Sequence, residues 1–229
     1  MNPDRTDYPY TVAAAPDYGL VNVTIPQGRT LRVEASAMAY MDSTLSMKAK
    51  MRGGFKRMLS GEKLFINEFT AADRSAEIGI APGTPGDVAH LYLENETVFL
   101  QNSSYLASSP DLDVAAEFQG FKGFFSGEKL FMVRCSGSGD LWFNTFGALL
   151  EIDVTDNYVV DTGHIVAFTD GLSYDVRSVA GLKSLFFSGE GLVCRFSGSG
   201  KVWIQTRKSM PFVMWADQYR RVQKKNDNN

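Results

Sequence analysis

The residues with the clearest potential for chemistry are three glutamates, each in a Ser-Gly-Glu string. The strings recur about every 65 residues and comprise Ser60-Gly61-Glu62, Ser126-Gly127-Glu128 and Ser188-Gly189-Glu190. A lysine precedes each string, at Lys56, Lys122 and Lys183. Three carboxylates near one axis could bind a hard cation such as Ca²⁺ or Mg²⁺. The lysines offer the glutamates another partner, and Ser and Gly are typical turn residues. We therefore predict turns and assign no metal ligand, with the cation site as the sharper alternative.

These strings belong to a longer repeat. Each leads into an apolar run, and the second and third copies also share Ser-Gly-Ser-Gly followed by Trp142 or Trp203. We expect both tryptophans to pack in the core, because Trp buries a large area; an aromatic wall between modules is the alternative. Self-similarity at a fixed period predicts tandem units. The predicted boundaries are 18–84, 85–147 and 148–208 for the modules, and 209–229 for a C-terminal helix and tail.

The local pattern within a module is that of strands. Leu20–Ile25 and Leu31–Val33 are rich in branched apolar residues and are separated by Pro26-Gln27-Gly28, which is typical of strand, turn and strand. The two Gly-rich strings predict tight hairpins, since glycine adopts left-handed geometry. Short strands with frequent turn signals indicate an all-β sandwich or barrel.

A helix is predicted only at the C-terminus. Ser209 is its expected cap, Pro211 stands in the first turn, and Phe212, Trp215, Tyr219 and Val222 share one face. This face should pack on a neighbouring module or subunit. The segments 1–15 and 225–229 contain little to bury and are expected to be loose.

The triple pattern Gly-[Phe/Leu]-Lys…Ser-Gly-Glu, together with the Gly-rich string before Trp, resembles the altered-inheritance-of-mitochondria family over roughly residues 18 to 208. The resemblance implies three tandem modules similar to the tryptophan RNA-binding attenuator protein (TRAP-like). Each module would be an antiparallel β-sandwich, and a pseudo-threefold arrangement is expected. Bacterial members of the family have no characterised biochemical function, and we expect this chain to be one of them. The resemblance supplies no catalytic residues.

Several catalytic motifs fail on inspection. A phosphate loop ending at Lys201 needs Gly and Ser/Thr where the chain has Arg195 and Val202, and a dinucleotide fingerprint fails at Trp142. His90 and His164 are too far apart in the sequence to suggest a shared metal site, so each is expected to be structural or exposed. No Gly-x-Ser-x-Gly string supports a Ser-His-Asp triad. The sequence thus assigns no catalytic residue and no cofactor.

Composition narrows the partners. The net charge is −3 and the pI is near 5.5, so nucleic-acid binding is not expected. The basic cluster around Arg220 fits a solvated helix end. Cys135 and Cys194 lie in apolar runs and should be buried thiols. No apolar run approaches the ~20 residues of a membrane span, and no signal peptide is evident, so a cytoplasmic location is expected.

Together these features favour a non-enzymatic oligomeric scaffold or binding protein. The triplication favours self-association, because modules with open edges can satisfy them with further copies. An unknown protein partner is expected as well. A small-molecule or metal-ion binding protein that uses clefts between modules, or the pseudo-threefold axis, is the first alternative. A nucleic-acid binder is the second alternative, which salt-dependent binding would support.

Overall fold

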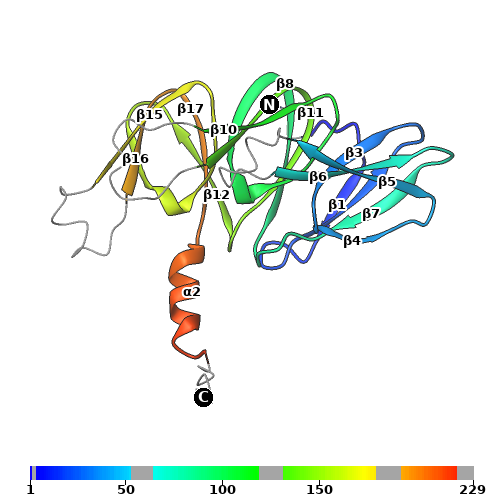
Figure 1. Cartoon of the computed structure of the whole chain (residues 1–229). Helices are drawn as coiled ribbons and strands as arrows, with labels where there is room; N and C mark the ends of the chain where they lie inside the picture. Colours follow the sequence, from blue (N-terminus) through cyan, green and yellow to red (C-terminus); the bar gives the residue numbers. More distant parts are fainter. Residues whose placement is uncertain (2–3, 53–63, 119–130, 179–191, 221–229) are drawn as a thin grey trace, which may run out of the picture.

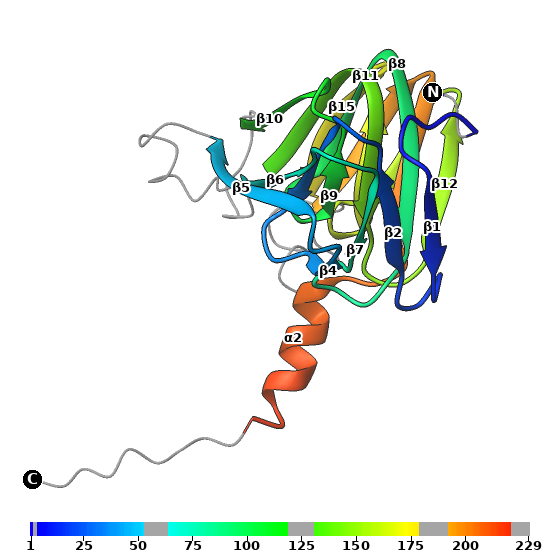
Figure 2. The same ribbon diagram turned by 90° about the vertical axis from the view of Figure 1, so that its right-hand side faces the viewer.

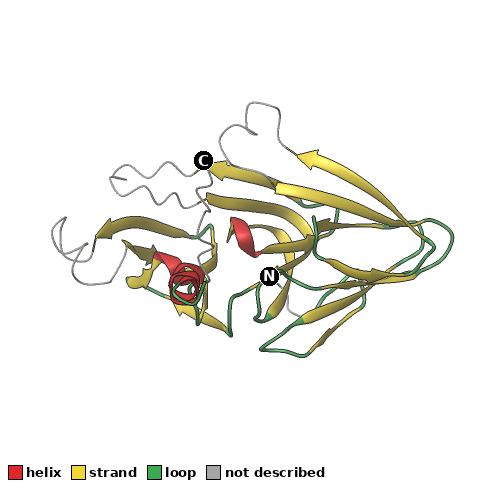
Figure 3. Cartoon of the chain, turned by 60° about the horizontal axis from the view of Figure 1, so that its bottom comes forward, coloured by secondary structure: helices red, strands yellow, loops and turns green. Residues whose placement is uncertain are grey.

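The computed structural model describes residues 1, 4–52, 64–118, 131–178 and 192–220. Strands dominate this part of the chain, and helix is confined to one C-terminal α-helix and two short 3₁₀ turns (Figure 3). The strand pairs are antiparallel and form sheets of four, ten and three strands. The prediction of an antiparallel all-β body with a short C-terminal helix is therefore confirmed.

The four-stranded sheet has the order β1-β2-β7-β4. Its strands are β1 (Tyr10–Ala13), β2 (Leu20–Ile25), β7 (Ala76–Ile80) and β4 (Met38–Met41). Strand β2 has the bounds that the sequence predicts. Its side chains alternate between partly and fully buried, with Val21, Val23 and Ile25 in the core, as expected for the two-residue period of a strand.

The large sheet runs along the molecule in the order β12-β17-β14-β8-β11-β9-β3-β6-β5, and β10 pairs with β11 beside this path (Figure 1). Its strands are β3 (Thr30–Glu34), β5 (Leu45–Arg52), β6 (Leu64–Ala71), β8 (Val88–Gln101), β9 (Tyr105–Ser108), β10 (Asp113–Phe118), β11 (Phe131–Asn144), β12 (Leu149–Val154), β14 (Ile165–Thr169) and β17 (Gly200–Gln205). The turns η1 (Asn102–Ser104) and η2 (Thr162–His164) lead into β9 and β14. The third sheet has the order β13 (Tyr158–Asp161), β16 (Leu192–Gly198), β15 (Leu172–Ser178).

The predicted hairpins at the Gly-rich strings are wrong. The first string lies inside β11, which continues through it and pairs with β8 across a bulge between Gly137 and Ser138. Asn95 is the extra residue of β8 at this bulge and has a φ of 60°. The second string separates β16 from β17, which belong to different sheets. The left-handed glycines, such as Gly137 (φ 117°) and Gly198 (φ 104°), thus bend strands rather than close hairpins.

The core consists of three adjoining apolar clusters. Trp142 is fully buried in the first with Val23 and Leu31, and Trp203 is buried in the second. The third contains Phe168 and Phe196. The prediction that both tryptophans are core residues is confirmed.

The N-terminal segment is ordered where the structure describes it, so the prediction that residues 1–15 are loose is wrong. Strand β1 pairs with β2 in the register Tyr10 opposite Val23. Tyr8 is fully buried, and the Met1 ammonium group forms an ion pair with Glu96 at 2.5 Å. The segment has few apolar residues, but its backbone and polar side chains find partners on the sheet.

The C-terminal helix α2 (Ser209–Asp217) projects from the end of β17 away from the sheets (Figures 1 and 2). The residue at its cap position is Lys208 and not Ser209, and no side chain caps the helix. None of its residues is buried, so its aromatic face does not pack into a core formed by the residues that the structure describes. In the described portion, no helix has the length and apolar character needed to cross a membrane.

Candidate functional site

The lysine, serine and glutamate candidates of the repeated Ser-Gly-Glu motif all lie outside the described part of the chain. These are Lys56, Ser60, Glu62, Lys122, Ser126, Glu128, Lys183, Ser188 and Glu190. The two other predicted candidates, Trp142 and Trp203, are core residues with 0% and 2% exposure. Trp203 donates its indole N–H to Glu151 at 2.9 Å. Neither tryptophan forms an exposed aromatic wall.

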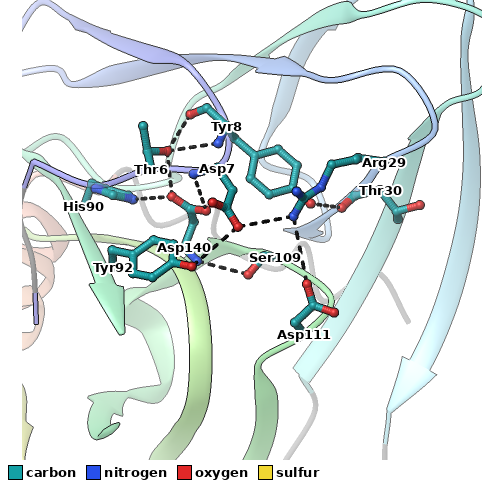
Figure 4. A network of polar contacts seen from close by, with 10 residues as sticks. All are labelled: Thr6, Asp7, Tyr8, Arg29, Thr30, His90, Tyr92, Ser109, Asp111 and Asp140. Atoms are coloured by element: carbon teal, nitrogen blue, oxygen red, sulfur yellow. Dashed lines mark hydrogen bonds and ion pairs between the residues drawn. The ribbon is translucent and has the colours of Figure 1, made fainter. Parts of the chain in front are cut away.

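A buried polar network joins the N-terminal segment to β8 and β11 (Figure 4). The Asp140 carboxylate is fully buried at its centre. Its Oδ1 accepts a hydrogen bond from the Thr6 hydroxyl (2.6 Å) and contacts His90 Nε2 (2.8 Å), and its Oδ2 accepts from the Asp7 N–H (3.1 Å). The Asp140 N–H donates to Ser109 Oγ at 3.0 Å. One carboxylate therefore holds two successive residues of the N-terminal segment.

A second ring of contacts surrounds this carboxylate. Tyr8 donates its hydroxyl to the Thr30 carbonyl at 2.7 Å, and the Arg29 guanidinium lies 4.8 Å from the centre of the Tyr8 ring. Arg29 also reaches Asp7 at 3.5 Å and Asp111 at 3.9 Å. The Tyr8 hydrogen bond and the Arg29–Asp7 contact fasten the N-terminal segment to the start of β3.

The His90–Asp140 pair is the feature closest to a catalytic dyad. The His90 ring is 1% exposed and lies between Tyr10 (4.7 Å between ring centres) and Trp142 (4.8 Å). Its second nitrogen, Nδ1, is buried and has no hydrogen-bond partner among the residues that the structure describes. A substrate cannot reach this nitrogen through the flanking rings, so the pair is best suited to anchoring the N-terminal segment.

An open groove with a volume of about 850 Å³ lies where α2 leaves the body. Tyr18 and Phe146 contribute to the body side, and Phe212 and Trp215 come from the helix. The Phe146 and Phe212 rings are 5.6 Å apart, and the aromatic row continues to Trp215 and Tyr219. The lining also includes His164, Arg207 and Lys208 and one carboxylate, Asp17. Lys208 is paired with Asp161 at 2.9 Å.

The helix itself exposes apolar side chains on all sides. The exposed fractions reach 68% for Met214 and 55% for Trp215, and Tyr219, just after the helix, is 70% exposed. Basic residues stand before and after this surface: Arg207 and Lys208 precede it, Arg220 follows it, and the sequence continues with Arg221, Lys224 and Lys225. We call Met210–Tyr219 and the adjoining groove the α2 surface. The sequence predicts the helix, but not that its aromatic face remains uncovered.

Outside the α2 surface, burial shifts the pKa of several titratable groups. Burial raises the pKa of the Glu34 carboxyl to about 7. Burial also raises the pKa of both thiols, that of Cys194 to about 12. A thiol with a raised pKa is a poor nucleophile and metal ligand. Within the described ranges, no three His, Cys, Asp or Glu side chains group as metal ligands.

Known proteins are similar to this chain in sequence and fold. Residues 10–207 match the family model described as Mitochondrial biogenesis AIM24. The uncharacterised protein M6_Spy0233 of Streptococcus pyogenes serotype M6 is 26% identical over 211 residues, which cover 86% of this chain and 85% of that protein. The X-ray crystal structure of protein SPYM3_0169 from Streptococcus pyogenes superposes with a TM-score of 0.79 at 25% identity and covers 93% of this chain and 100% of that one. Since the family model spans most of its length, the chain belongs to the AIM24 family.

Proposed function

We propose that this protein is a non-enzymatic cytoplasmic scaffold that assembles with further copies of itself and binds another macromolecule through the α2 surface. The observation that carries the proposal is that α2 exposes Met210, Phe212, Val213, Met214 and Trp215, each by more than half of its surface. A helix that is apolar on all sides is normally buried. Contiguous exposed apolar side chains mark interaction sites.

The charges beside α2 define the chemistry of its partner. Arg207 lies in the groove and Arg220 just beyond the helix, where it is 3.9 Å from Asp217, so a cationic group stands at each end of the apolar surface. Another copy of α2 would bring like charges together in a parallel or an antiparallel pair, which disfavours that contact. An apolar groove with acidic residues at its rim complements both features. We therefore propose a protein partner with such a groove.

The strand pairing supports three tandem TRAP-like modules with the predicted boundaries 18–84, 85–147 and 148–208. One set of three-stranded pairings recurs as β2-β7-β4, β8-β11-β9 and β12-β17-β14. A second set recurs as β3-β6-β5, β8-β11-β10 and β13-β16-β15. In the second unit, β8 and β11 each serve as two successive strands, which explains their length.

The proposal of a non-enzymatic role rests on the surroundings of the reactive groups. His90 and Asp140 are enclosed and hold the N-terminal segment. Cys135 and Cys194 are buried, and their raised pKa keeps them protonated. These four side chains are accounted for by folding.

A small-molecule binding protein is the second candidate. The groove volume of about 850 Å³ falls within the usual range for ligand sites. Its aromatic rings and its cations, including Arg207, suit a flat anionic ligand. A nucleic acid is a weaker candidate, because the chain as a whole carries a net charge of −3.

Native mass spectrometry of the purified protein separates the first two candidates. The scaffold predicts integer multiples of the 25.3 kDa chain. A reproducible excess mass that is lost on denaturation, and lost from Trp215→Ser, would favour the ligand instead.

Partner capture then tests the α2 surface. The full-length wild type, the double variant Phe212→Ser/Trp215→Ser and the control Leu150→Ser are immobilised and exposed to one bacterial lysate. Leu150 is 51% exposed on β12, so its substitution removes a similar apolar contact elsewhere. We expect a protein retained by the wild type and the control but lost from the double variant. Identical capture by all three proteins would contradict the proposed role of α2.

A further inference from the structure

The third strands of the three repeated units differ from one another in how far they are buried. In the second and third units these strands are β9 and β14, and their core residues are fully enclosed. In the first unit the strand is β4, and all four of its residues are exposed. Tyr40 and Met41 have exposed fractions of 49% and 37%. The third strand is therefore buried in the second and third units and exposed in the first.

The covering strand comes from the preceding unit in both cases. Strand β3 pairs with β9, with Arg32 opposite Ser108 and Val33 opposite Ala107. The second half of β8 pairs with β14 in the same register, with Phe99 opposite Phe168 and Leu100 opposite Ala167. We call each of these pairings between successive units a joint. In both joints, the second strand of one unit pairs antiparallel with the third strand of the next, and we call this the pairing rule.

Among the strands that the structure describes, the pairing rule leaves two without such a partner. The second strand of the last unit is β13, which is the edge of the three-stranded sheet, and β4 is the edge of the four-stranded sheet. Tyr158 and Val159 on β13 are 43% and 52% exposed. An edge strand with apolar side chains and free backbone groups is a template for another strand.

We infer that β13 of one copy of this chain pairs antiparallel with β4 of the next copy and so repeats the two joints inside the chain. This inference rests on the proposed scaffold and names the surface through which it assembles. The internal registers place Val159 opposite Met41 and Val160 opposite Tyr40. Such cross-strand pairs of apolar side chains stabilise a sheet.

The two strands cannot meet within one chain in this structure. Figure 1 shows β4 at one end of the molecule and β16, the neighbour of β13, at the other. The joint is therefore between chains, and it uses a different strand on each side. A head-to-tail contact of this type closes into a ring or continues as a filament.

Two half-blocked variants test the inference, each with a lysine that blocks only one of the two edge strands. Lysine on an edge strand opposes strand pairing, so Met41→Lys blocks β4 and Val159→Lys blocks β13. By light scattering after gel filtration, we expect the wild type to exceed the 25.3 kDa chain mass and each variant alone to be monomeric. Each variant retains one open edge, and a 1:1 mixture should form a dimer of one chain of each kind.

Matched controls use exposed residues of other edges. Met47→Lys on β5 and Leu150→Lys on β12 introduce the same charge at side chains that are 50% and 51% exposed. Both controls should keep the wild-type mass. Circular dichroism and thermal melting verify that all four variants are folded.

Three results would overturn the inference: a monomeric wild type up to 100 μM or so, a mixture that stays monomeric, or assembly that persists in either half-blocked variant. The α2 variants separate this inference from the wider proposal. If Phe212→Ser/Trp215→Ser assembles but captures no partner, and Val159→Lys captures the partner as a monomer, the two surfaces act independently. If assembly fails while capture is retained, only the strand joint is wrong.

Discussion

The Tyr40 ring on β4 lies directly over Gly79 on β7, the residue it faces across the strand pair. A Cβ atom added to Gly79 would be 2.3 Å from Tyr40 Cε1. At the corresponding positions of the other two units, Trp142 faces Ala107 and Trp203 faces Ala167. Each pair thus joins one large and one small residue. In the second and third units the third strand carries the small residue, whereas in the first unit it carries the large one.

This relationship predicts that the effect of a substitution at Gly79 depends on Tyr40. Gly79→Ala should lower the free energy of unfolding by about 1–2 kcal/mol, because the ring must move from its place. In the Tyr40→Ala background the same change should be neutral or stabilising, since glycine weakens a strand. Urea denaturation of the four proteins of this cycle measures the coupling. Equal effects in both backgrounds would contradict the packing described.

Asp140 should contribute to stability through the N-terminal segment. Asp140→Ala removes the acceptor for the Thr6 hydroxyl, the Asp7 N–H and His90. We expect a loss of about 2–4 kcal/mol, since donors left buried without a partner are costly. Hydrogen exchange should become faster over residues 4–13. The control Asp111→Ala, whose side chain is 71% exposed, should leave both properties nearly unchanged.

The raised pKa of Glu34 should make the free energy of unfolding depend on pH. Burial raises the pKa of this carboxyl from 4.5 to about 7 in the folded chain. The folded state therefore favours the protonated form. The contribution of protonated Glu34 to the free energy of unfolding is fully present below pH 4.5. It is lost as the pH rises toward 7, and the stability changes no further with this group above that pH.

Substitution of Glu34 should remove this dependence. Glu34→Gln should be more stable than the wild type at pH 8 by about 1–2 kcal/mol, a value that allows for the carboxyl's partial exposure to solvent. At pH 4 the two proteins should differ little. Urea denaturation across this range provides the measurement, with Glu77→Gln on an exposed position as the control. A constant difference between Glu34→Gln and the wild type would show that burial does not perturb Glu34.

The two thiols should be unreactive in the native protein. Cys135 and Cys194 are free and buried, and their raised pKa leaves almost no thiolate at pH 8. A thiol reagent should titrate no group in the native protein within minutes and two groups in urea. Fast reaction of either thiol before unfolding would mean that its strand opens locally.

Several features were predictable because local chemistry fixes them. The run Leu20–Ile25 forms a strand with the expected bounds, since its branched residues alternate between core and surface. The large area of Trp142 and Trp203 favours burial in almost any fold, and both are core residues. Gly137 and Gly198 adopt the left-handed backbone that glycine permits. The same property serves turns and bulges alike, so the hairpin prediction failed.

The Asp140 network and the uncovered α2 surface were not predictable. Asp140 binds residues more than 130 positions earlier in the chain, and nothing in the sequence near either partner shows this pairing. The N-terminal segment is polar and reads as loose until the carboxylate that holds it is known. The apolar face of α2 predicted a covering partner, but only its place in the fold shows that the described part of this chain leaves it exposed.

The sequence by itself determined the strand-rich class, the recurring motifs and the C-terminal helix, because these depend on residue type and spacing over short distances. The tertiary structure decided which strands meet. It covers β9 and β14 with strands of the preceding unit and leaves β4 and β13 at the edges of the described sheets. The physical reason is that strand pairing satisfies backbone groups that are the same in every residue, so the choice of partner is set by how the whole chain folds back on itself.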